Sequence, residues 1–437
     1  MKRIASYIVL AAIAFNSCNK KEDKVFDKSI DERLNETLAA DQKALTGAPY
    51  GWKGFIYPAG LKGGVVAFYF KFNDSNRVEM FSDFDAASAV TPMTASYRLK
   101  ALQQPSLIFD TYSYVHVLAD PDGSVNGGDY GAGLGSDFEF AIDSMAKDSV
   151  KLTGRFNKSK AFLVKATQAE MQSYYDKKYS NRLFANISKY TTYFKRLVIG
   201  SSQYEIKVDQ TTRTVTLTWV DDKGAVHSVT TGYYYTTDGI VLSPAIVAGA
   251  NVISSLNNIS WSGTGPTMSF TINGTASSIV GAVEPINIDP DAPQRWWQYA
   301  LDQDGYWISP KGFHVNGVDD AYGITKTANF YFLMYQPQRG TQSGIAYDLA
   351  GTVKVVNNAL SLPYGIAYRP PNFTGDGRVS FSYFGTLGTV PTADSIPVYK
   401  TAIQFTDASG YYLVRIDSTH YDMVSAKDGK AWISWQY

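Results

Sequence analysis

Short strand-like segments bounded by turn residues follow one another along much of the chain. Val215, Leu217 and Trp219 alternate with threonines, which is the two-residue period of a sheet with one buried face. The tetrad Asn-Asp-Ser-Asn at 73–76 is a turn between two such segments. Segments joined by short turns pair as antiparallel strands, so the sequence predicts antiparallel sheets. The strand candidates are 52–57, 65–72, 77–81, 94–99, 106–109, 138–142, 149–153, 161–165, 204–208, 213–220, 225–230, 232–235, 329–335, 353–356, 402–405, 411–416 and 430–436.

Two helical segments interrupt the strand pattern. Ser29 and Glu32 have the spacing of a capping box, apolar residues recur on one face up to Leu45, and Gly47 supplies a stop. Residues 168–194 are rich in Ala, Gln, Lys and Tyr, which favours one or two further helices. The order helix, strands, helix, strands suggests two halves of similar build.

The amino terminus has the order of charged and apolar residues that is typical of a secretory signal. Lys2 and Arg3 precede an apolar run at 4–15, which is shorter than the about 20 residues of a membrane-spanning helix. Cys18 is the only cysteine, so no intramolecular disulfide forms, and Ser17 before it suits lipoprotein processing. We predict cleavage before Cys18 and lipidation of its thiol, which would hold the protein to a membrane. An ordinary secreted protein cut nearby is the alternative.

A polar tether follows Cys18. Within it, Lys21, Glu22 and Asp23 resemble the signal of a lysine and paired acids that sends Bacteroidota lipoproteins to the outer face of the outer membrane. The predicted location is therefore the outer membrane, with the protein lipid-anchored and facing the cell exterior. A simple charged spacer is the alternative, because short charge runs are common in linkers.

A cluster of prolines marks the clearest domain boundary. Pro285, Pro290 and Pro293 suit an extended connector, and the part after them is rich in Trp and Tyr. The predicted fold class is α+β and predominantly antiparallel β, with two helical segments in the N-terminal region of sheets and a C-terminal β-sandwich or barrel-like module. The predicted organisation is a signal peptide at 1–17, a tether at 18–28, a helix plus antiparallel sheet at 29–166 and again at 167–284, a Pro-rich linker at 285–293 and an aromatic-rich β domain at 294–437.

The charge balance argues against nucleic acid as a partner. Lys and Arg number 40 and Asp and Glu number 40, so no net positive field draws a polyanion. The four histidines are widely spaced, and no cofactor-binding or nucleophile motif is present in the sequence. Asp120, Asp122 and Asp129 are a weak calcium candidate, but the Asp-Pro-Asp-Gly stretch that holds the first two is better explained as a turn. No metal and no cofactor are predicted.

Aromatic residues are concentrated after the predicted linker. Trp296, Trp297, Tyr306 and Trp307 crowd a short stretch, which suits a stacking platform for sugar rings or an anchor for a partner protein. Core packing is the favoured alternative, because aromatic residues at strand spacing usually fill sheet interiors.

Five short motifs stand out in the first part of the chain: Val25-Phe26-Asp27, Asp31-Glu32-Arg33-Leu34-Asn35, Leu45 through Pro49-Tyr50-Gly51-Trp52-Lys53, Phe70-Lys71-Phe72-Asn73 and Phe109-Asp110-Thr111-Tyr112. Together they resemble a Bacteroidota surface lipoprotein family, domain of unknown function family 4302. The resemblance covers roughly residues 25–285 and is strongest in the first hundred or so. Families of this kind are commonly encoded beside SusC/SusD-type outer-membrane nutrient importers, so the resemblance implies an accessory role, and it supplies no catalytic residues.

The leading hypothesis is a cell-surface, lipid-anchored accessory protein of a SusCD-type uptake system. It would bind a nutrient ligand, a glycan or a peptide, or pack on the transporter. A surface hydrolase of glycans or peptides is one alternative, because a pair of acids about 5 to 9.5 Å apart can come from anywhere in a fold. A purely structural subunit is the other, and the sequence assigns no enzyme activity.

Overall fold

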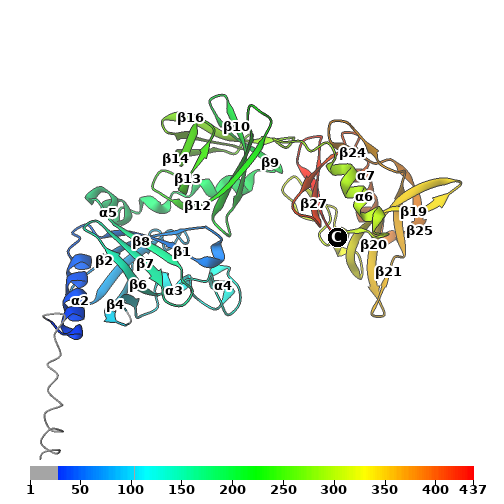
Figure 1. Cartoon of the computed structure of the whole chain (residues 1–437). Helices are drawn as coiled ribbons and strands as arrows, with labels where there is room; N and C mark the ends of the chain where they lie inside the picture. Colours follow the sequence, from blue (N-terminus) through cyan, green and yellow to red (C-terminus); the bar gives the residue numbers. More distant parts are fainter. Residues whose placement is uncertain (1–27, 103) are drawn as a thin grey trace, which may run out of the picture.

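The computed structural model describes residues 28–102 and 104–437. The described residues do not include the predicted signal peptide, Cys18, or the predicted surface-export residues Lys21, Glu22 and Asp23. Figure 1 shows two barrels and then a curved sheet with helices, in chain order. All strand pairs among the described residues are antiparallel, which confirms the predicted fold class.

Helix α2 (Ile30–Thr46) begins and ends as its sequence predicts. Ser29 caps it and forms the full capping box with Glu32, and the N–H of Gly47 donates to the Lys43 carbonyl at the other end. The indole N–H of Trp52, the first residue of the following strand, donates to the carbonyl of Leu45 at 2.9 Å. This hydrogen bond ties the end of the helix to the first barrel.

The first barrel contains the strands that the sequence predicts between residues 52 and 165. Strand β1 pairs with both β2 and β8, which closes the sheet. Its interior is aromatic, and the rings of Phe70 and Phe109 lie 5.5 Å apart there. Within the described residues the strands are β1 (Trp52–Tyr57), β2 (Val66–Phe72), β3 (Arg77–Ser82), β4 (Met93–Ala101), β5 (Pro105–Phe109), β6 (Glu139–Met145), β7 (Ser149–Gly154) and β8 (Lys160–Lys165), with short helices η1 (Ala59–Leu61), α3 (Tyr114–Val117) and α4 (Gly123–Asn126) between them.

The connector between the barrels consists of three short helices, α5 (Gln168–Tyr175), η2 (Lys178–Ser180) and η3 (Leu183–Lys189). The predicted helical region therefore ends near residue 189 and not near 194. Residues 194–199 read Phe-Lys-Arg-Leu-Val-Ile, and this apolar, β-branched run forms the next strand.

A second closed barrel follows the connector. Strand β9 pairs with both β10 and β16, so this sheet also has no free edge among the described residues. The suggested halves of similar build are thus two barrels, each preceded by helices. The strands of the second barrel are β9 (Phe194–Ile199), β10 (Ser202–Asp209), β11 (Thr214–Val220), β12 (Val226–Tyr235), β13 (Ile240–Ala248), β14 (Asn251–Ser262), β15 (Thr267–Ile272) and β16 (Thr275–Ala282).

The C-terminal module is a 12-stranded sheet of the described residues, packed against two helices, α6 (Ala292–Asp302) and α7 (Thr392–Phe405). Only residues 381–382 separate β24, next to one edge, from β25 at the other edge, so the sheet curls back on itself. The strands are β17 (Trp307–Ser309), β18 (His314–Val315), β19 (Phe330–Gln342), β20 (Ile345–Val356), β21 (Ala359–Ser361), β22 (Tyr364–Tyr368), β23 (Asn372–Phe373), β24 (Arg378–Ser380), β25 (Tyr383–Gly388), β26 (Tyr411–Arg415), β27 (His420–Ser425) and β28 (Ala431–Gln436), and η4 (Ile324–Lys326) precedes β19.

The prediction of a strand at 402–405 is wrong, because these residues form the last turn of α7. Val398, Ala402 and Phe405 are buried at helical spacing, and that face packs into the core of the module. Within the described residues, no helix has both the length and the apolar character to cross a membrane.

The second barrel and the C-terminal module are packed together at the proline-rich segment. The Tyr193 hydroxyl donates to Asp422 at 2.6 Å, and Phe194 lies in one apolar cluster with Tyr412 and Val424. Arg196 donates to the carbonyl of Glu284, which precedes the prolines, at 2.6 Å. The connection is therefore held by side chains from both of its neighbours.

Candidate functional site

A cavity of about 340 Å³ lies where the two barrels and α5 meet. Figure 1 shows α5 and the rest of the connector passing between the barrels at this place. Strands β1 and β2 line it from the first barrel, β12 and β13 from the second, and α5 and η2 from the connector. Its lining residues are Lys53, Phe55, Ala67, Ala169, Glu170, Ser173, Tyr174, Tyr179, Tyr234, Tyr235, Thr236, Thr237 and Val241.

Aromatic rings make up much of the wall. Phe55 of β1 and Tyr234 of β12 are half-buried, with ring centroids 4.8 Å apart and planes at 51°. Tyr174 and Tyr179 are buried and stack at 4.1 Å with planes at 9°. Burial raises the pKa of Tyr234 to about 12, so its hydroxyl stays protonated and neutral at physiological pH.

Among the described residues that line the cavity, the charged ones are Lys53 and Glu170, and they form an ion pair. Lys53 Nζ lies 2.5 Å from Glu170 Oε1, and both side chains are about one-third exposed, at 28% and 33%. The other oxygen of Glu170 accepts from the backbone N–H of Thr167 at 2.8 Å, in the capping box that begins α5. Burial acts to raise the pKa of Glu170, but the hydrogen bonds from Lys53 and Thr167 outweigh it, and the pKa is lowered overall.

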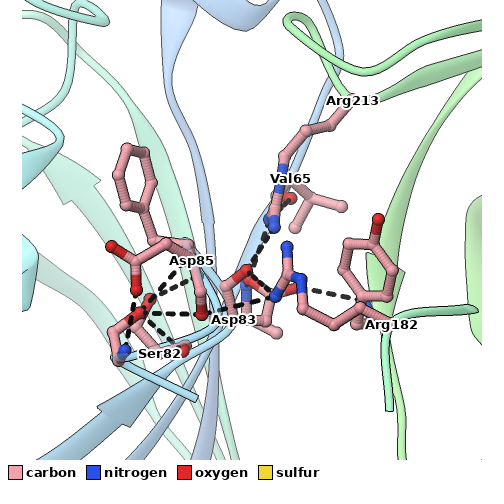
Figure 2. A network of polar contacts seen from close by, with 10 residues as sticks. Val65, Ser82, Asp83, Asp85, Arg182 and Arg213 are labelled. Carbon is pink, nitrogen blue, oxygen red and sulfur yellow. Dashed lines mark hydrogen bonds and ion pairs between the residues drawn. The ribbon is translucent and has the colours of Figure 1, made fainter. Parts of the chain in front are cut away.

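Beside the cavity, a buried carboxylate joins the two barrels, as Figure 2 shows. Asp83 follows β3 of the first barrel, and Arg213 precedes β11 of the second. Asp83 Oδ1 accepts from Arg213 Nη1 at 2.8 Å and from the backbone N–H of Ala67 at 2.8 Å, and its Oδ2 accepts from the N–H of Tyr235 at 2.9 Å. Since Ala67 and Tyr235 also line the cavity, this carboxylate fixes the backbone of both barrel walls.

Two guanidinium groups cover the ring of Tyr235. The carbon at the centre of the Arg182 guanidinium lies 4.0 Å from the ring centroid, and that of Arg213 lies 5.7 Å away. Arg182 also donates to the Asp83 carbonyl at 3.0 Å. The connector and both barrels therefore meet at one cluster of cations, a carboxylate and an aromatic ring.

Close backbone contact brings the barrels together at the edge of this cluster. A Cβ on Gly64 would lie 1.9 Å from the Thr212 carbonyl oxygen, and one on Gly232 would lie 2.2 Å from that of Gly63. Tyr57 and Ser243 share a hydrogen bond of 2.8 Å between their hydroxyls across the same boundary. Only glycine permits this approach at 64 and 232.

The four aromatic residues considered for a stacking platform, Trp296, Trp297, Tyr306 and Trp307, do not form one exposed surface. Trp296 and Trp307 are fully buried and stack in the core of the C-terminal module, so the favoured alternative of core packing holds for them. Trp297 is half-buried and donates to the buried carboxylate of Asp348 at 2.7 Å. Tyr306 is 39% exposed and stays a candidate contact residue. Trp296 of α6 and Trp307 of β17 meet in the interior, where the Trp307 indole N–H also donates to the Trp296 carbonyl.

The carboxylates of the calcium candidate do not assemble a cation site. Asp120 accepts from the Tyr112 hydroxyl at 2.6 Å and from the N–H of Asp122, and Asp122 caps α4 through the N–H of Ser124. Asp129 pairs with Gly133 through its backbone. Among the described residues, no three His, Cys, Asp or Glu side chains gather as metal ligands. The turn interpretation accounts for Asp120 and Asp122.

Sequence reasoning missed the residues of the inter-barrel cavity. The three consecutive tyrosines at 233–235 were a signal, because alternation in a strand sends Tyr234 to the face opposite Tyr233 and Tyr235. Tyr233 and Tyr235 are buried and Tyr234 is half-buried, and of the three both Tyr234 and Tyr235 line the cavity. Its partner Phe55 lies in another barrel, which no local pattern indicates.

Comparison with known families places this cavity in a recognised segment. The family model described as Domain of unknown function (DUF4302) matches residues 22–261, more than half of the chain. The chain belongs to the DUF4302 family. The match spans the first barrel, the connector and the second barrel as far as β14, so all residues that line the cavity lie inside the DUF4302 segment.

Other comparisons add little to the DUF4302 assignment. No curated protein matches the sequence. Among solved structures, the crystal structure of isotype 1 transferrin binding protein B from serogroup B Neisseria meningitidis is 11% identical with a TM-score of 0.12, over 85% of this chain. The match covers 65% of that protein, and at this TM-score it supports no statement on fold or function.

Proposed function

We propose that this DUF4302 protein is a lipid-anchored accessory protein on the cell surface, part of a SusCD-type outer-membrane nutrient uptake system, and that it binds a nutrient ligand between its two barrels. The observation that carries the proposal is the preformed inter-barrel cavity. Its volume of about 340 Å³ falls in the range of small-molecule sites, and it combines aromatic walls with a few polar groups.

The chemistry of the cavity favours binding over hydrolysis. Glycoside hydrolysis uses two carboxyl groups about 5 to 9.5 Å apart, one of which must act as an acid or base. Among the described residues that line the cavity, Glu170 is the carboxylate, and Lys53 and Thr167 engage both of its oxygens. Because both of its oxygens are engaged and its pKa is lowered, this carboxylate is a weak base, and the described lining offers no second carboxylate to act with it.

The amino-terminal residues supply the anchor in this proposal. Cys18 would carry the lipid, and Lys21, Glu22 and Asp23 would direct the protein to the outer face. Several acyl chains on one cysteine give lasting membrane attachment, because each buried methylene contributes about 0.8 kcal/mol. The anchor would keep the inter-barrel cavity close to the importer that receives the ligand.

Fractionation of cells that express the natural protein tests this role. The wild-type protein is expected in the outer membrane, cut by external protease on intact cells, and co-purified with importer subunits. Cys18→Ala should release it from the membrane, whereas Asn19→Ala, the matched control, should leave it attached. Membrane retention of Cys18→Ala, or isolation of the wild-type protein with no importer subunit, would overturn the proposal.

A further inference from the structure

We propose that the inter-barrel cavity accepts a neutral, hydroxyl-rich ligand with an apolar face, a pyranose unit of a saccharide, and that Phe55 and Tyr234 form its stacking surface. This inference rests on the proposed function, which places a ligand in the cavity but leaves a glycan and a peptide open. Four features of the cavity decide between them: its charge, its rings, its hydroxyl groups and its strand edges.

The charge of the cavity favours a neutral ligand. Lys53 and Glu170 neutralise each other at 2.5 Å, and they are the charged residues among the described lining. Both carboxylate oxygens already accept hydrogen bonds, so Glu170 has little capacity left for an ammonium group. A charged ligand would have to lose its hydration without gaining a free counter-charge, which is costly.

The two rings suit the flat face of a sugar. Phe55 and Tyr234 are half-buried, and their planes meet at 51°, so they present a corner and not a closed stack. The face of an aromatic ring is electronegative and attracts the weakly positive C–H groups of a pyranose. The neighbouring residues hold the corner in place, since the N–H of Tyr235 donates to buried Asp83 and Tyr57 hydrogen bonds to Ser243.

Hydroxyl groups surround this corner. Ser173 lies on α5, and Thr236 and Thr237 follow β12, and all three are half-exposed at the cavity. Because burial raises the pKa of Tyr234 to about 12, its phenol stays a hydrogen-bond donor at neutral pH. Neutral donors and acceptors of this kind match the hydroxyls of a sugar without the desolvation of an ion.

The strand pairing argues against an extended peptide. Peptides commonly bind by adding a strand to a free sheet edge. Strand β1 pairs with both β2 and β8 at Phe55. At Tyr234 and Tyr235, β12 pairs with β13 on one side, and its pairing with β11 ends at Gly232. On that second side the N–H groups of Tyr233 and Tyr235 already donate to the Arg213 carbonyl and to Asp83, so neither is free for an added strand. A ligand there must be recognised through side chains.

Calorimetry on the full-length protein in detergent tests the inference. The probes are neutral oligosaccharides, uronic-acid and sulfated oligosaccharides, and short peptides of each charge. At least one neutral saccharide should bind, and Tyr234→Ala should weaken it about tenfold or more, while Tyr234→Phe retains most of the affinity. Tyr383→Ala, an exposed tyrosine on β25, is the matched control and should change nothing.

A variant that blocks the cavity tests the same inference if Tyr234→Ala folds poorly. Ser173→Phe adds a ring at the mouth of the cavity from a half-exposed helix position and should abolish saccharide binding while the melting temperature stays near that of the wild type.

Two results would overturn the inference and leave the proposed function standing. In the first, only a charged saccharide or a peptide binds, and the Tyr234 and Ser173 variants weaken it. In the second, no probe responds to either variant although the protein co-purifies with importer subunits. Failure of the proposed function itself would appear in the fractionation experiment, independently of the probes.

Discussion

Asp83 and Arg213 form a buried ion pair across the boundary between the two barrels, with 2.8 Å between Oδ1 and Nη1 and with side chains only 2% and 7% exposed. Burial acts to lower the pKa of Arg213, but the charge and hydrogen bonds of Asp83 outweigh it, so the guanidinium stays charged. Arg213 also donates to the carbonyls of Val65 and Asp83. This ion pair therefore helps to fix the relative position of the two cavity walls, together with the other contacts between the barrels.

Replacing Asp83 by alanine should destabilise the barrels strongly. The change leaves a buried guanidinium without its counter-charge and the N–H groups of Ala67 and Tyr235 without their acceptor. Breaking a buried pair in this way costs about 3–5 kcal/mol of the free energy of unfolding. Urea denaturation measures it, and Asp148→Ala, which removes an exposed pair with Lys165, is the control and should leave the midpoint unchanged.

The double variant Asp83→Ala with Arg213→Met removes both charges. It therefore distinguishes the loss of the ion pair from the cost of leaving a buried guanidinium without its partner. It should be less destabilised than Asp83→Ala alone, because no unpaired cation remains in the interior. A double variant at least as unstable as the single one would contradict the view that the stranded guanidinium causes most of the loss.

Gly64→Ala should loosen the contact between the barrels. A Cβ at this position would lie 1.9 Å from the Thr212 carbonyl oxygen, which is backbone and cannot rotate away. Forcing the barrels apart should cost about 1–3 kcal/mol, measured by chemical denaturation. Gly385→Ala is the control, because its Cβ would enter open space. Equal stability of the two variants would contradict the close approach of the barrels.

The local elements were predictable where one short segment contains its own signal. Ser29 and Glu32 fix the start of α2, and turn-bounded alternation locates β1 to β8. Helix α7 was missed because β-branched residues such as Ile396 and Ile403, together with Pro397 inside the helix, imitate strand and loop patterns. Its burial pattern is helical only when the core it faces is known.

The candidate site was not predictable for a different reason. The approach of Phe55 to Tyr234, and of Asp83 to Arg213, depends on how two closed barrels dock. Hydrophobic periodicity specifies which face of a strand is buried within a barrel, but it does not specify which outer surfaces of the two barrels come into contact. For the aromatic residues after the prolines, the sequence left both a stacking platform and core packing open, because the clustering of tryptophans in sequence does not distinguish a surface from a core.

Acid should loosen α5 from the cavity. The hydrogen bonds from Lys53 and Thr167 lower the pKa of Glu170 below its ordinary value of 4.5 despite burial. A carboxyl group with a lowered folded-state pKa contributes stability above its unfolded-state pKa, and this is lost as the pH falls through the folded-state value. The protection of the α5 amides against hydrogen exchange, taken relative to the intrinsic exchange rate at each pH, should therefore fall below about pH 4.5.

A matched pair of variants isolates this carboxylate. Glu170→Gln should lower the protection of the α5 amides at pH 7 and reduce the further loss of protection in acid. Glu36→Gln, which removes an exposed acid of α2 that pairs with Lys28, should leave the α5 profile unchanged. An α5 profile identical in the wild type and Glu170→Gln would show that another group controls the helix.

Trp307→Ala should test whether the aromatic cluster after the prolines serves the core. Trp307 is fully buried, stacks on Trp296 at 5.9 Å, and donates its indole N–H to the Trp296 carbonyl at 2.9 Å. Its loss should cost about 3–5 kcal/mol in chemical denaturation, because the cavity left in the core cannot collapse fully. Tyr306→Ala, next in sequence but 39% exposed, should cost under about 1 kcal/mol. If Trp307→Ala instead kept full stability and abolished saccharide binding, the ligand surface would lie in the C-terminal module and not between the barrels.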